Sequence, residues 1–375
     1  MLCEAEHVLV CARCGRVFKR VVFRCPSCGG LTIFKYSDKS FSVDKSYPGI
    51  WRYRFQLPKI SKTISRGEGL TPINKVMGVL VKNERFNPTG TYADRASSII
   101  SSYLLSSGID RVRVRFEEDF TYSLAYYLDG ALQVEILVDD PLSLDYSDIA
   151  VLSRAEGVSL SLESSSLGES YLSYVNPLTI EGLKTISFEI YERKVGVDRV
   201  VVPAKTGLLA FSIWKGFKDL EEIGLDIPYE VAAVFIKGSK NSFPLDLARY
   251  VKVYEIERDE VLRSLLKLCK KGFVIKPLSA LAFTLSDILS NSLAIVTMGF
   301  RSLVRSNTRN TNVRREILQV LKSYGEATAY EVWKKLPIYT LRGIYKVMSS
   351  MEERGEICVE IRSRGARKVK YYRMC

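Results

Sequence analysis

Short apolar runs alternate with helix-period segments from about residue 45 to about residue 305, and this alternation limits the possible folds more than any other feature. Two of these runs lie at residues 134–138 and 199–203. Parallel strands must be joined by a crossover connection, which is usually a helix. The alternation therefore favours βαβ units around a largely parallel sheet, which places this part of the chain in the α/β class.

The chain has 375 residues, of which 47% are hydrophobic, so it can bury a large core. A length of this order suggests two or three domains. The polar stretch 305–312 reads as a linker. The predicted domains are 1–40, 41–305 and 306–375.

No run of 18 apolar residues is available to span a bilayer. Glu4 and Glu6 stand where a signal peptide would carry positive charge. We therefore expect a cytoplasmic protein.

Four cysteines near the start form two Cys-x-x-Cys pairs, namely Cys11 with Cys14 and Cys25 with Cys28. In a reducing compartment such pairs favour a metal over a disulfide. Two knuckles at this spacing can converge on one Zn²⁺ ion, and four thiolates leave no open coordination position. We predict a zinc ribbon over residues 1–40 with a structural ion, and the alternative is four free surface cysteines.

The last fifth of the chain is strongly basic. Residues 301–375 contain 17 lysines or arginines against seven glutamates and no aspartate, which is +10 of the formal net charge of +13. A field of one sign attracts a polyanion. This part of the chain is therefore expected to bind nucleic acid.

Three helix patterns and a hairpin follow residue 312. Thr328 and Glu331 match a capping box at the start of the second helix, and Thr340 could cap the third. Two strands are predicted at 357–361 and 368–372 around a basic tip. This order is typical of a winged helix-turn-helix, in which the third helix and the wing meet double-stranded DNA. The predicted DNA-binding residues are Arg342, Lys346, Arg362, Arg364, Arg367, Lys368 and Lys370, and a protein-binding winged helix is the alternative.

The body resembles threonine synthase, a pyridoxal-phosphate enzyme of fold type II, in a series of phrases that occur in the same order. They are residues 67–72 (GEGLTP), 82–84 (KNE), 87–95 (NPTGTYADR), 181–185 (EGLKT) and 215–217 (KGF). A zinc ribbon ahead of the body also occurs in archaeal-type members. The resemblance implies a two-lobed body. We interpret Lys82 and Glu84 as a solvated pair beside a strand.

The same resemblance places the cofactor contacts. Where the family has its Schiff-base lysine, this chain has Ala93, which offers no amine. The family asparagine that meets the cofactor ring corresponds to Asp119, and its glycine-rich phosphate cup corresponds to residues 205–208 (KTGL). Side chains in such a cup crowd the phosphate. The former cofactor pocket is therefore predicted to contain Ala93, Asp119, Lys205, Thr206, Gly207 and Thr297.

These observations favour a catalytically inactive relative that acts as a DNA-binding regulator or scaffold, and we do not expect it to bind pyridoxal phosphate. Its body would sense a small anionic ligand, held by Lys205, or form a homodimer. One alternative is an active lyase that makes threonine from O-phosphohomoserine with a displaced lysine. Another is a nonenzymatic partner in protein assembly.

Overall fold

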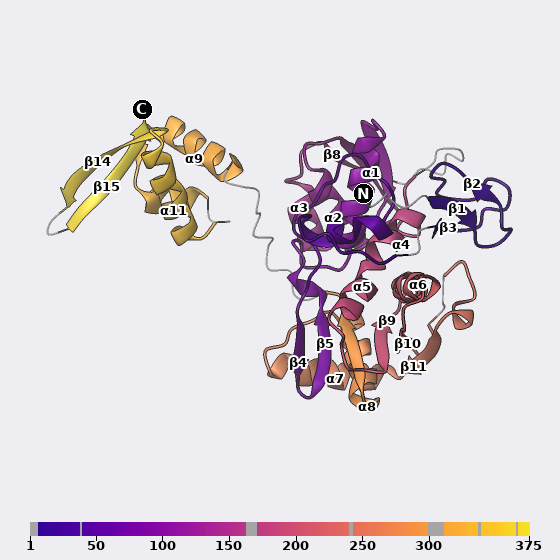
Figure 1. The fold of residues 1–375 in the computed structure, drawn as a ribbon. Coiled ribbons are helices and arrows are strands. Elements are labelled where there is room, and N and C mark those ends of the chain that lie inside the picture. Colours follow the sequence, from indigo (N-terminus) through magenta and orange to yellow (C-terminus); the bar gives the residue numbers. More distant parts are fainter. Residues whose placement is uncertain are drawn as a thin grey trace. The chain divides into compact units, whose positions relative to one another are not determined.

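The computed structural model describes residues 7–37, 40–162, 171–239, 243–298, 311–336, 339–364 and 367–375. The chain forms two compact units, Met1–Val304 and Arg305–Cys375 (Figure 1). Within the described ranges, no helix is both long enough and apolar enough to cross a membrane. Glu4, Glu6, linker residues 305–310 and Pro337 lie outside these ranges.

An antiparallel three-stranded sheet begins the first unit. Its strands are β1 (His7–Cys11), β2 (Val17–Phe18) and β3 (Thr32–Tyr36), in the order β2-β1-β3. Leu9 and Phe34 are buried beneath it. The hydroxyl of Tyr36 at the end of β3 donates a hydrogen bond to the carboxylate of Glu181, so this small sheet packs on the body.

The large lobe is built on a six-stranded sheet of order β11-β10-β9-β12-β5-β4. Only the β4–β5 pair is antiparallel, and the other neighbours are parallel as the alternating pattern predicts. Apolar residues follow Arg199 in β9 and Ser292 in β12, and β12 is buried at every position because helices cover the sheet. The strands are β4 (Ile73–Val76), β5 (Val79–Asn83), β9 (Arg199–Pro203), β10 (Glu230–Ile236), β11 (Lys252–Ile256) and β12 (Ser292–Val296).

The helices of this lobe begin at residues suited to a first turn. Pro277 opens α8, where a missing amide hydrogen costs nothing, and Asp259 and Glu260 lie in the first turn of α7. Gly207 precedes α6 with a left-handed backbone, φ 86°. The helices are α5 (Thr185–Glu192), α6 (Leu208–Glu222), α7 (Arg258–Lys270) and α8 (Pro277–Ile288).

The small lobe contains a parallel sheet of order β6-β7-β8 with its own helices (Figure 1). The Asn176 side chain caps α4 by accepting a hydrogen bond from the Thr179 amide at 2.9 Å. The elements are β6 (Arg111–Arg115), β7 (Gln133–Val138), β8 (Val158–Leu162), α1 (Asp94–Ser106), α2 (Phe120–Leu128), α3 (Tyr146–Leu152) and α4 (Pro177–Leu183).

Helices α1 and α4 approach very closely at Gly182. A Cβ atom at this position would lie 2.3 Å from the backbone oxygen of Arg95. Only glycine permits that approach, because no side chain separates the two backbones. This contact holds the start of α1 against α4. Ala93 is the residue that directly precedes α1.

The second unit packs three helices against a small antiparallel sheet of order β13-β15-β14. Its core contains Ile317, Leu321, Val332, Ile344 and Met348. The elements are α9 (Thr311–Tyr324), β13 (Glu326–Ala327), α10 (Ala329–Lys335), α11 (Leu341–Glu353), β14 (Ile357–Arg364) and β15 (Arg367–Met374).

Both predicted helix caps of this unit are confirmed. The Thr328 hydroxyl accepts from the Glu331 amide at 3.2 Å, and the Glu331 carboxylate accepts from the Thr328 amide at 2.8 Å. The Thr340 hydroxyl accepts from the Gly343 amide at 3.1 Å. Local hydrogen-bonding chemistry was sufficient to place these two helix starts.

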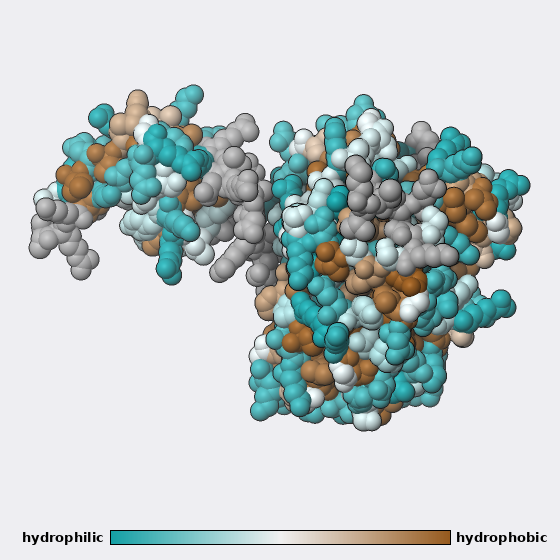
Figure 2. Space-filling model, viewed as in Figure 1, coloured by the Kyte–Doolittle hydropathy of each residue, from teal (hydrophilic) through white to brown (hydrophobic). Residues whose placement is uncertain are grey.

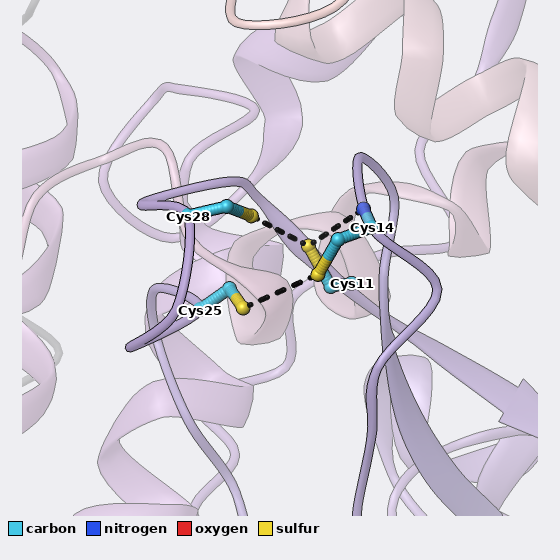
Figure 3. Close-up of side chains that lie close together, drawn as sticks. All are labelled: Cys11, Cys14, Cys25 and Cys28. Carbon is cyan, nitrogen blue, oxygen red and sulfur yellow. Dashed lines mark hydrogen bonds between the residues drawn. The ribbon is translucent and has the colours of Figure 1, made fainter.

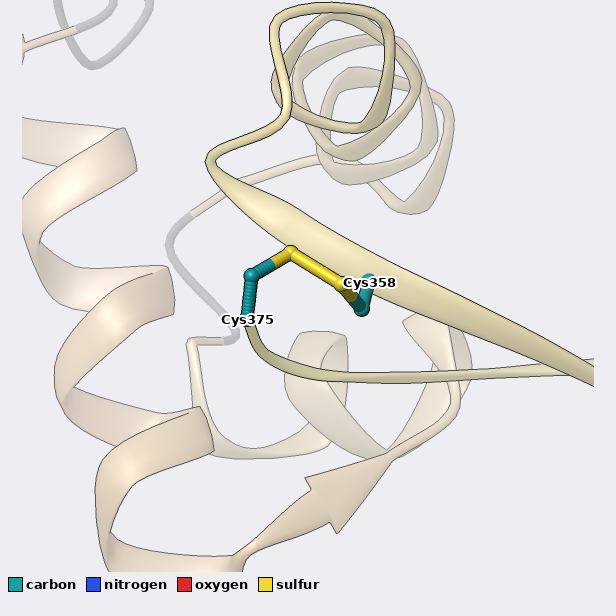
Figure 4. Close-up of a disulfide and its surroundings, with 2 residues drawn as sticks. All are labelled: Cys358 and Cys375. Carbon is teal, nitrogen blue, oxygen red and sulfur yellow. A yellow bond between two sulfur atoms is a disulfide. The ribbon is translucent and has the colours of Figure 1, made fainter.

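Two sequence predictions for this unit were wrong in detail. Residues 311–312 are not linker but the first residues of α9. The hairpin strands are longer than predicted, so Arg362 lies within β14 and not at the tip. A disulfide between Cys358 and Cys375, with Cα atoms 5.0 Å apart, also joins β14 to the end of the chain (Figure 4), and the sequence analysis did not foresee it.

Candidate functional site

The four cysteines predicted to bind zinc converge at one point (Figure 3). Their sulfur atoms all lie within 4.8 Å of one another. The distance is 3.4 Å from Cys11 Sγ to Cys28 Sγ and 3.7 Å from Cys14 Sγ to Cys25 Sγ. A tetrahedron with metal–sulfur bonds of about 2.3 Å has edges of about 3.8 Å, so the group could hold one metal ion.

Backbone amides support negative charge on these sulfur atoms. The Arg13 amide donates to Cys11 Sγ at 3.4 Å. Burial alone would raise the pKa of the Cys25 thiol, but hydrogen bonds from the Ser27 and Cys28 amides lower it to about 6. A thiolate is the form that binds a metal, so the local backbone favours the ligand state.

A cavity of about 370 Å³ lies in the body, and five of the six residues predicted for the former cofactor pocket line it. They are Asp119, Lys205, Thr206, Gly207 and Thr297. The strand ends and helix starts of both lobes supply them, as expected where parallel strands end and their helices begin. Asp119 and Thr297, which are 178 positions apart in the sequence, thus line the same cavity.

Ala93 is the exception. It is fully buried, does not line the cavity, and directly precedes α1. Its amide donates to the Thr91 hydroxyl at 3.3 Å. A buried methyl group can neither bind a cofactor covalently nor move a proton.

The wall of the cavity before α2 is acidic. Glu117, Glu118 and Asp119 all line it, and Asp119 has a positive φ of 66°. Lys276, just before α8, forms ion pairs with Glu118 and, at 3.2 Å, with Asp119. Burial raises the pKa of the Glu117 carboxyl, whereas the nearby Arg115 and Lys205 charges oppose that rise. No sequence pattern indicated Lys276, because nothing local connects it to Glu118, which lies 158 positions earlier.

The position of the phosphate cup lies at the start of α6. The Thr206 hydroxyl accepts a hydrogen bond from the Leu208 amide at 3.4 Å. This amide, at the start of the helix, is therefore already engaged and not open to a phosphate. Gly207 is the one glycine in this four-residue phrase. With Ala93 in place of an amine and carboxylates opposite, the residues present do not fit pyridoxal phosphate.

Hydroxyl groups form the remaining polar wall. The Thr297 hydroxyl lies 2.9 Å from the Ser279 hydroxyl, and the Tyr92 and Tyr174 hydroxyls lie 2.9 Å from each other. The two tyrosines and Phe116 line the cavity with aromatic rings. Tyr92 belongs to the phrase 87–95, which assigned it no role, and no motif contained Tyr174. The fold brings their two hydroxyls together from segments 82 positions apart.

Lys82 and Glu84 are not a solvated pair, so that interpretation was wrong. Both are fully buried in a network with Arg95 and Glu189. Lys82 Nζ lies 2.6 Å from Glu189 Oε2, and Arg95 pairs with Glu84 at 2.7 Å and with Glu189 at 2.6 Å. This network therefore ties β5, α1 and α5 together.

Four of the seven predicted DNA-binding residues have side chains that the structure describes, and these four form two groups. Arg342 and Lys346 are exposed on α11. Arg362 instead donates two hydrogen bonds to Glu326, at 2.7 and 2.8 Å, and Lys370 pairs with Glu352 at 3.0 Å. The side chains of Arg364, Arg367 and Lys368 lie outside the described part of the structure. Figure 2 shows mainly hydrophilic residues over the visible face of this unit.

The body has the fold of pyridoxal-phosphate enzymes of fold type II. O-ureido-L-serine synthase superposes with a TM-score of 0.50 and 16% sequence identity, over 64% of this chain and 92% of that chain. Threonine deaminase isoform 2 from Solanum lycopersicum gives 0.51 and 14%, over 61% and 83%. A lysine-to-alanine variant of O-ureido-L-serine synthase, with O-ureido-L-serine bound, gives 0.51 and 16%, over 64% and 91%.

In sequence, the chain is similar to curated threonine synthases. The enzyme of Methanocaldococcus jannaschii is 30% identical over 250 residues, which are 57% of this chain and 62% of that protein. The enzyme of Methanosarcina acetivorans is 28% identical over 249 residues, or 58% and 61%. The chain thus spans about three fifths of the length of these curated relatives. No family model matches it.

Proposed function

We propose that this chain is a threonine synthase homologue without pyridoxal-phosphate catalysis, which binds double-stranded DNA through its C-terminal unit as a regulator or scaffold. The identity of Ala93 carries the first part of the proposal. The basic charge of the last 75 residues, +10 of +13, supports the second.

In the alternative, an active lyase, one of two lysines beside the cavity would supply the amine that binds the cofactor. Lys276 is engaged with Glu118 and Asp119, whereas Lys205 is exposed at the wall. Either amine would have to take over a role whose own position is a buried methyl group. A cofactor phosphate would also meet the acidic residues 117–119, and like charges about 4 Å apart cost on the order of 4 kcal/mol at an effective dielectric of 20.

The test is an absorbance titration of the purified chain with pyridoxal phosphate. We expect no stable yellow band and no threonine from O-phosphohomoserine. Ala93→Lys should not restore either, because the residues 117–119 and 205–208 still oppose the phosphate. A yellow band that disappears in Lys205→Ala would favour the lyase, and a yellow, active Ala93→Lys variant would contradict multiple losses at the site.

We further propose that the C-terminal unit is a winged helix, with α11 as the helix that enters the major groove. Arg342 and Lys346 are exposed on α11, which agrees with this placement. The hairpin of β14 and β15 would be the wing. Since Arg362 and Lys370 already pair with carboxylates, they are proposed to contribute less to phosphate binding than the tip residues Arg364 and Arg367.

DNA affinity of the full chain measured against salt tests this. Each neutralised phosphate gives a slope of about −0.9 in log K against log salt, and four to six contacts would give roughly −4 to −5. Arg364→Ala with Arg367→Ala should flatten the slope by about two units, whereas the matched Arg362→Ala should change it less. Arg342→Ala should alter sequence preference. No binding at low salt would favour a protein-binding module.

The cysteine group is proposed to hold one structural Zn²⁺ ion. Small ribbons derive much of their folding free energy from the metal. Metal analysis should find one zinc ion per chain, which Cys28→Ser should release and the matched Cys269→Ser, at an exposed site on α7, should retain. A zinc-free protein whose N-terminal 40 residues resist protease equally well would contradict the proposal.

A further inference from the structure

The carboxylates of the cavity lie in two groups on neighbouring strands. Glu117, Glu118 and Asp119 follow β6, and Asp139 and Asp140 follow β7. These strands are parallel neighbours, and the Phe116 amide donates to the Leu137 oxygen at 2.8 Å beyond the paired segment. Both groups therefore lie at the same edge of the small sheet, facing one cavity.

We propose that this cavity binds a small organic cation with two ammonium groups. Five carboxylates line it, and the nearby cationic side chains are Lys205, Lys276 and Arg115. Arg115 pairs with Asp139 at 2.6 Å, and Lys276 with Glu118 and Asp119, so an excess of negative charge remains. The proposal rests on the proposed function in one respect, namely that pyridoxal phosphate does not occupy the cavity.

A metal ion fits this lining poorly. A hard cation needs six or more oxygen ligands at about 2–2.6 Å from one point. Among the His, Cys, Asp and Glu side chains that the structure describes, only the four cysteines form a group of three or more that could hold a metal ion. The five carboxylates form no such set, and they follow two different strands, which suits two separate ammonium groups.

The aromatic and hydroxyl groups suit an organic ligand. Tyr92, Phe116 and Tyr174 line the cavity, and aromatic rings attract ammonium groups while covering the carbon chain between them. Thr297 and Ser143 add hydroxyl oxygens, which can accept hydrogen bonds from an ammonium group. A volume of about 370 Å³ lies at the lower end of small-molecule pockets and therefore admits a short diamine.

The same carboxylates would repel the small anionic ligand that was predicted to bind at Lys205. The two ligand classes respond oppositely to the loss of this lysine. Without Lys205, a diammonium ligand escapes a like charge and binds more tightly, whereas an anion loses its attractive partner. The sign of one substitution therefore separates them.

The experiment is calorimetric titration of the full, zinc-loaded chain with 1,4-diaminobutane, inorganic phosphate and MgCl₂. We expect binding of the diamine, about tenfold weaker in Glu117→Gln and in Asp119→Asn, and several-fold tighter in Lys205→Ala. Glu222→Gln, an exposed carboxylate at the far end of α6, is the matched control and should leave the affinity unchanged.

Absence of diamine binding, or equal affinity in Glu117→Gln, Asp119→Asn and Glu222→Gln, would overturn the proposal. Phosphate binding that Lys205→Ala abolishes would establish the anion instead, and Mg²⁺ binding lost in Asp119→Asn would establish a metal site. Circular dichroism of each variant shows whether it is folded. The pyridoxal-phosphate titration is a separate measurement, so a yellow cofactor complex would end the proposed function, while colourless protein that ignores the diamine would end this inference alone.

Discussion

Two sets of charged residues in the body differ in what surrounds them. The side chains of Lys82, Glu84, Arg95 and Glu189 are 0% exposed and form ion pairs with one another. At the cavity wall, Asp119, Lys276 and Glu118 have side chains 12%, 26% and 49% exposed. A buried charge that loses its partner keeps a large desolvation cost, whereas a charge at a wet wall is hydrated.

The two sets also differ in what they do for the fold. The buried network joins β5, α1 and α5, so the fold requires it whether or not any ligand binds. Glu117, Glu118, Asp119, Lys205 and Thr206 line the cavity, so their side chains can change the ligand that it accepts. The buried network therefore maintains the fold, whereas the residues of the cavity wall determine what the cavity can bind.

The largest expected effect is on the buried network. Glu189→Ala should lower the free energy of unfolding of the body by about 3–5 kcal/mol, because Arg95 and Lys82 would remain buried without their shared carboxylate. Urea unfolding followed by tryptophan fluorescence measures this. Glu118→Ala at the cavity wall serves as the matched control and should cost less than about 1 kcal/mol. Equal losses in the two variants would erase the distinction between the regions.

Asp94, the first residue of α1, is a buried carboxyl that belongs to neither set and forms no ion pair with either of them. Burial raises the pKa of its carboxyl from 3.8 to about 7, although the Ser123 and Thr89 hydroxyls donate hydrogen bonds to it. The folded state therefore binds the proton more tightly, and this contribution to stability is full below about pH 4 and is lost as pH rises to about 7.

The corresponding variant is Asp94→Asn, which cannot titrate. The stability of the wild type relative to this variant should fall between pH 4 and pH 8, by at most about 4 kcal/mol. Urea unfolding of both proteins across that range measures the difference. A difference independent of pH would mean that Asp94 is charged in the folded state throughout.

The smallest effect is expected at Lys276. Lys276→Met removes ion pairs that are partly exposed, so the free energy of unfolding should change by less than about 1 kcal/mol. Thermal unfolding in low and high salt measures it. A loss as large as that of Glu189→Ala would show that the cavity wall is part of the scaffold after all.

Much of the architecture could be predicted from the sequence because local rules are strong there. The alternation of apolar runs predicted the parallel sheet, and the spacing of four cysteines predicted their convergence. Thr328 and Glu331 predicted a helix start to the residue. Ordered phrases shared with threonine synthase predicted that Asp119, Lys205 and Thr297 meet at one cavity.

The remaining features depend on contacts between distant segments. Lys276 meets Asp119 across 157 positions, and Glu189 meets Lys82 across 107, so no local pattern contains either pair. The exposure of Lys82 was misjudged because its charge suggested water, while its partners lie elsewhere in the chain. The hairpin of β14 and β15 is longer than predicted. Its strand register determines which residues contact Arg362 and brings Cys358 close to Cys375.

The contact at Gly182 has a consequence for mutational tolerance. Because a Cβ atom there would overlap the Arg95 backbone, every other amino acid forces α1 and α4 apart. Gly216 is comparable, since its Cβ would lie 2.6 Å from the Lys184 oxygen. In a library of all single substitutions selected for soluble expression, these two glycines should be among the most depleted positions, while positions 205 and 206 should accept many residues. Protein abundance alone, without any assay of activity, would then separate the positions that maintain the helix crossing from those that are free to acquire a new ligand.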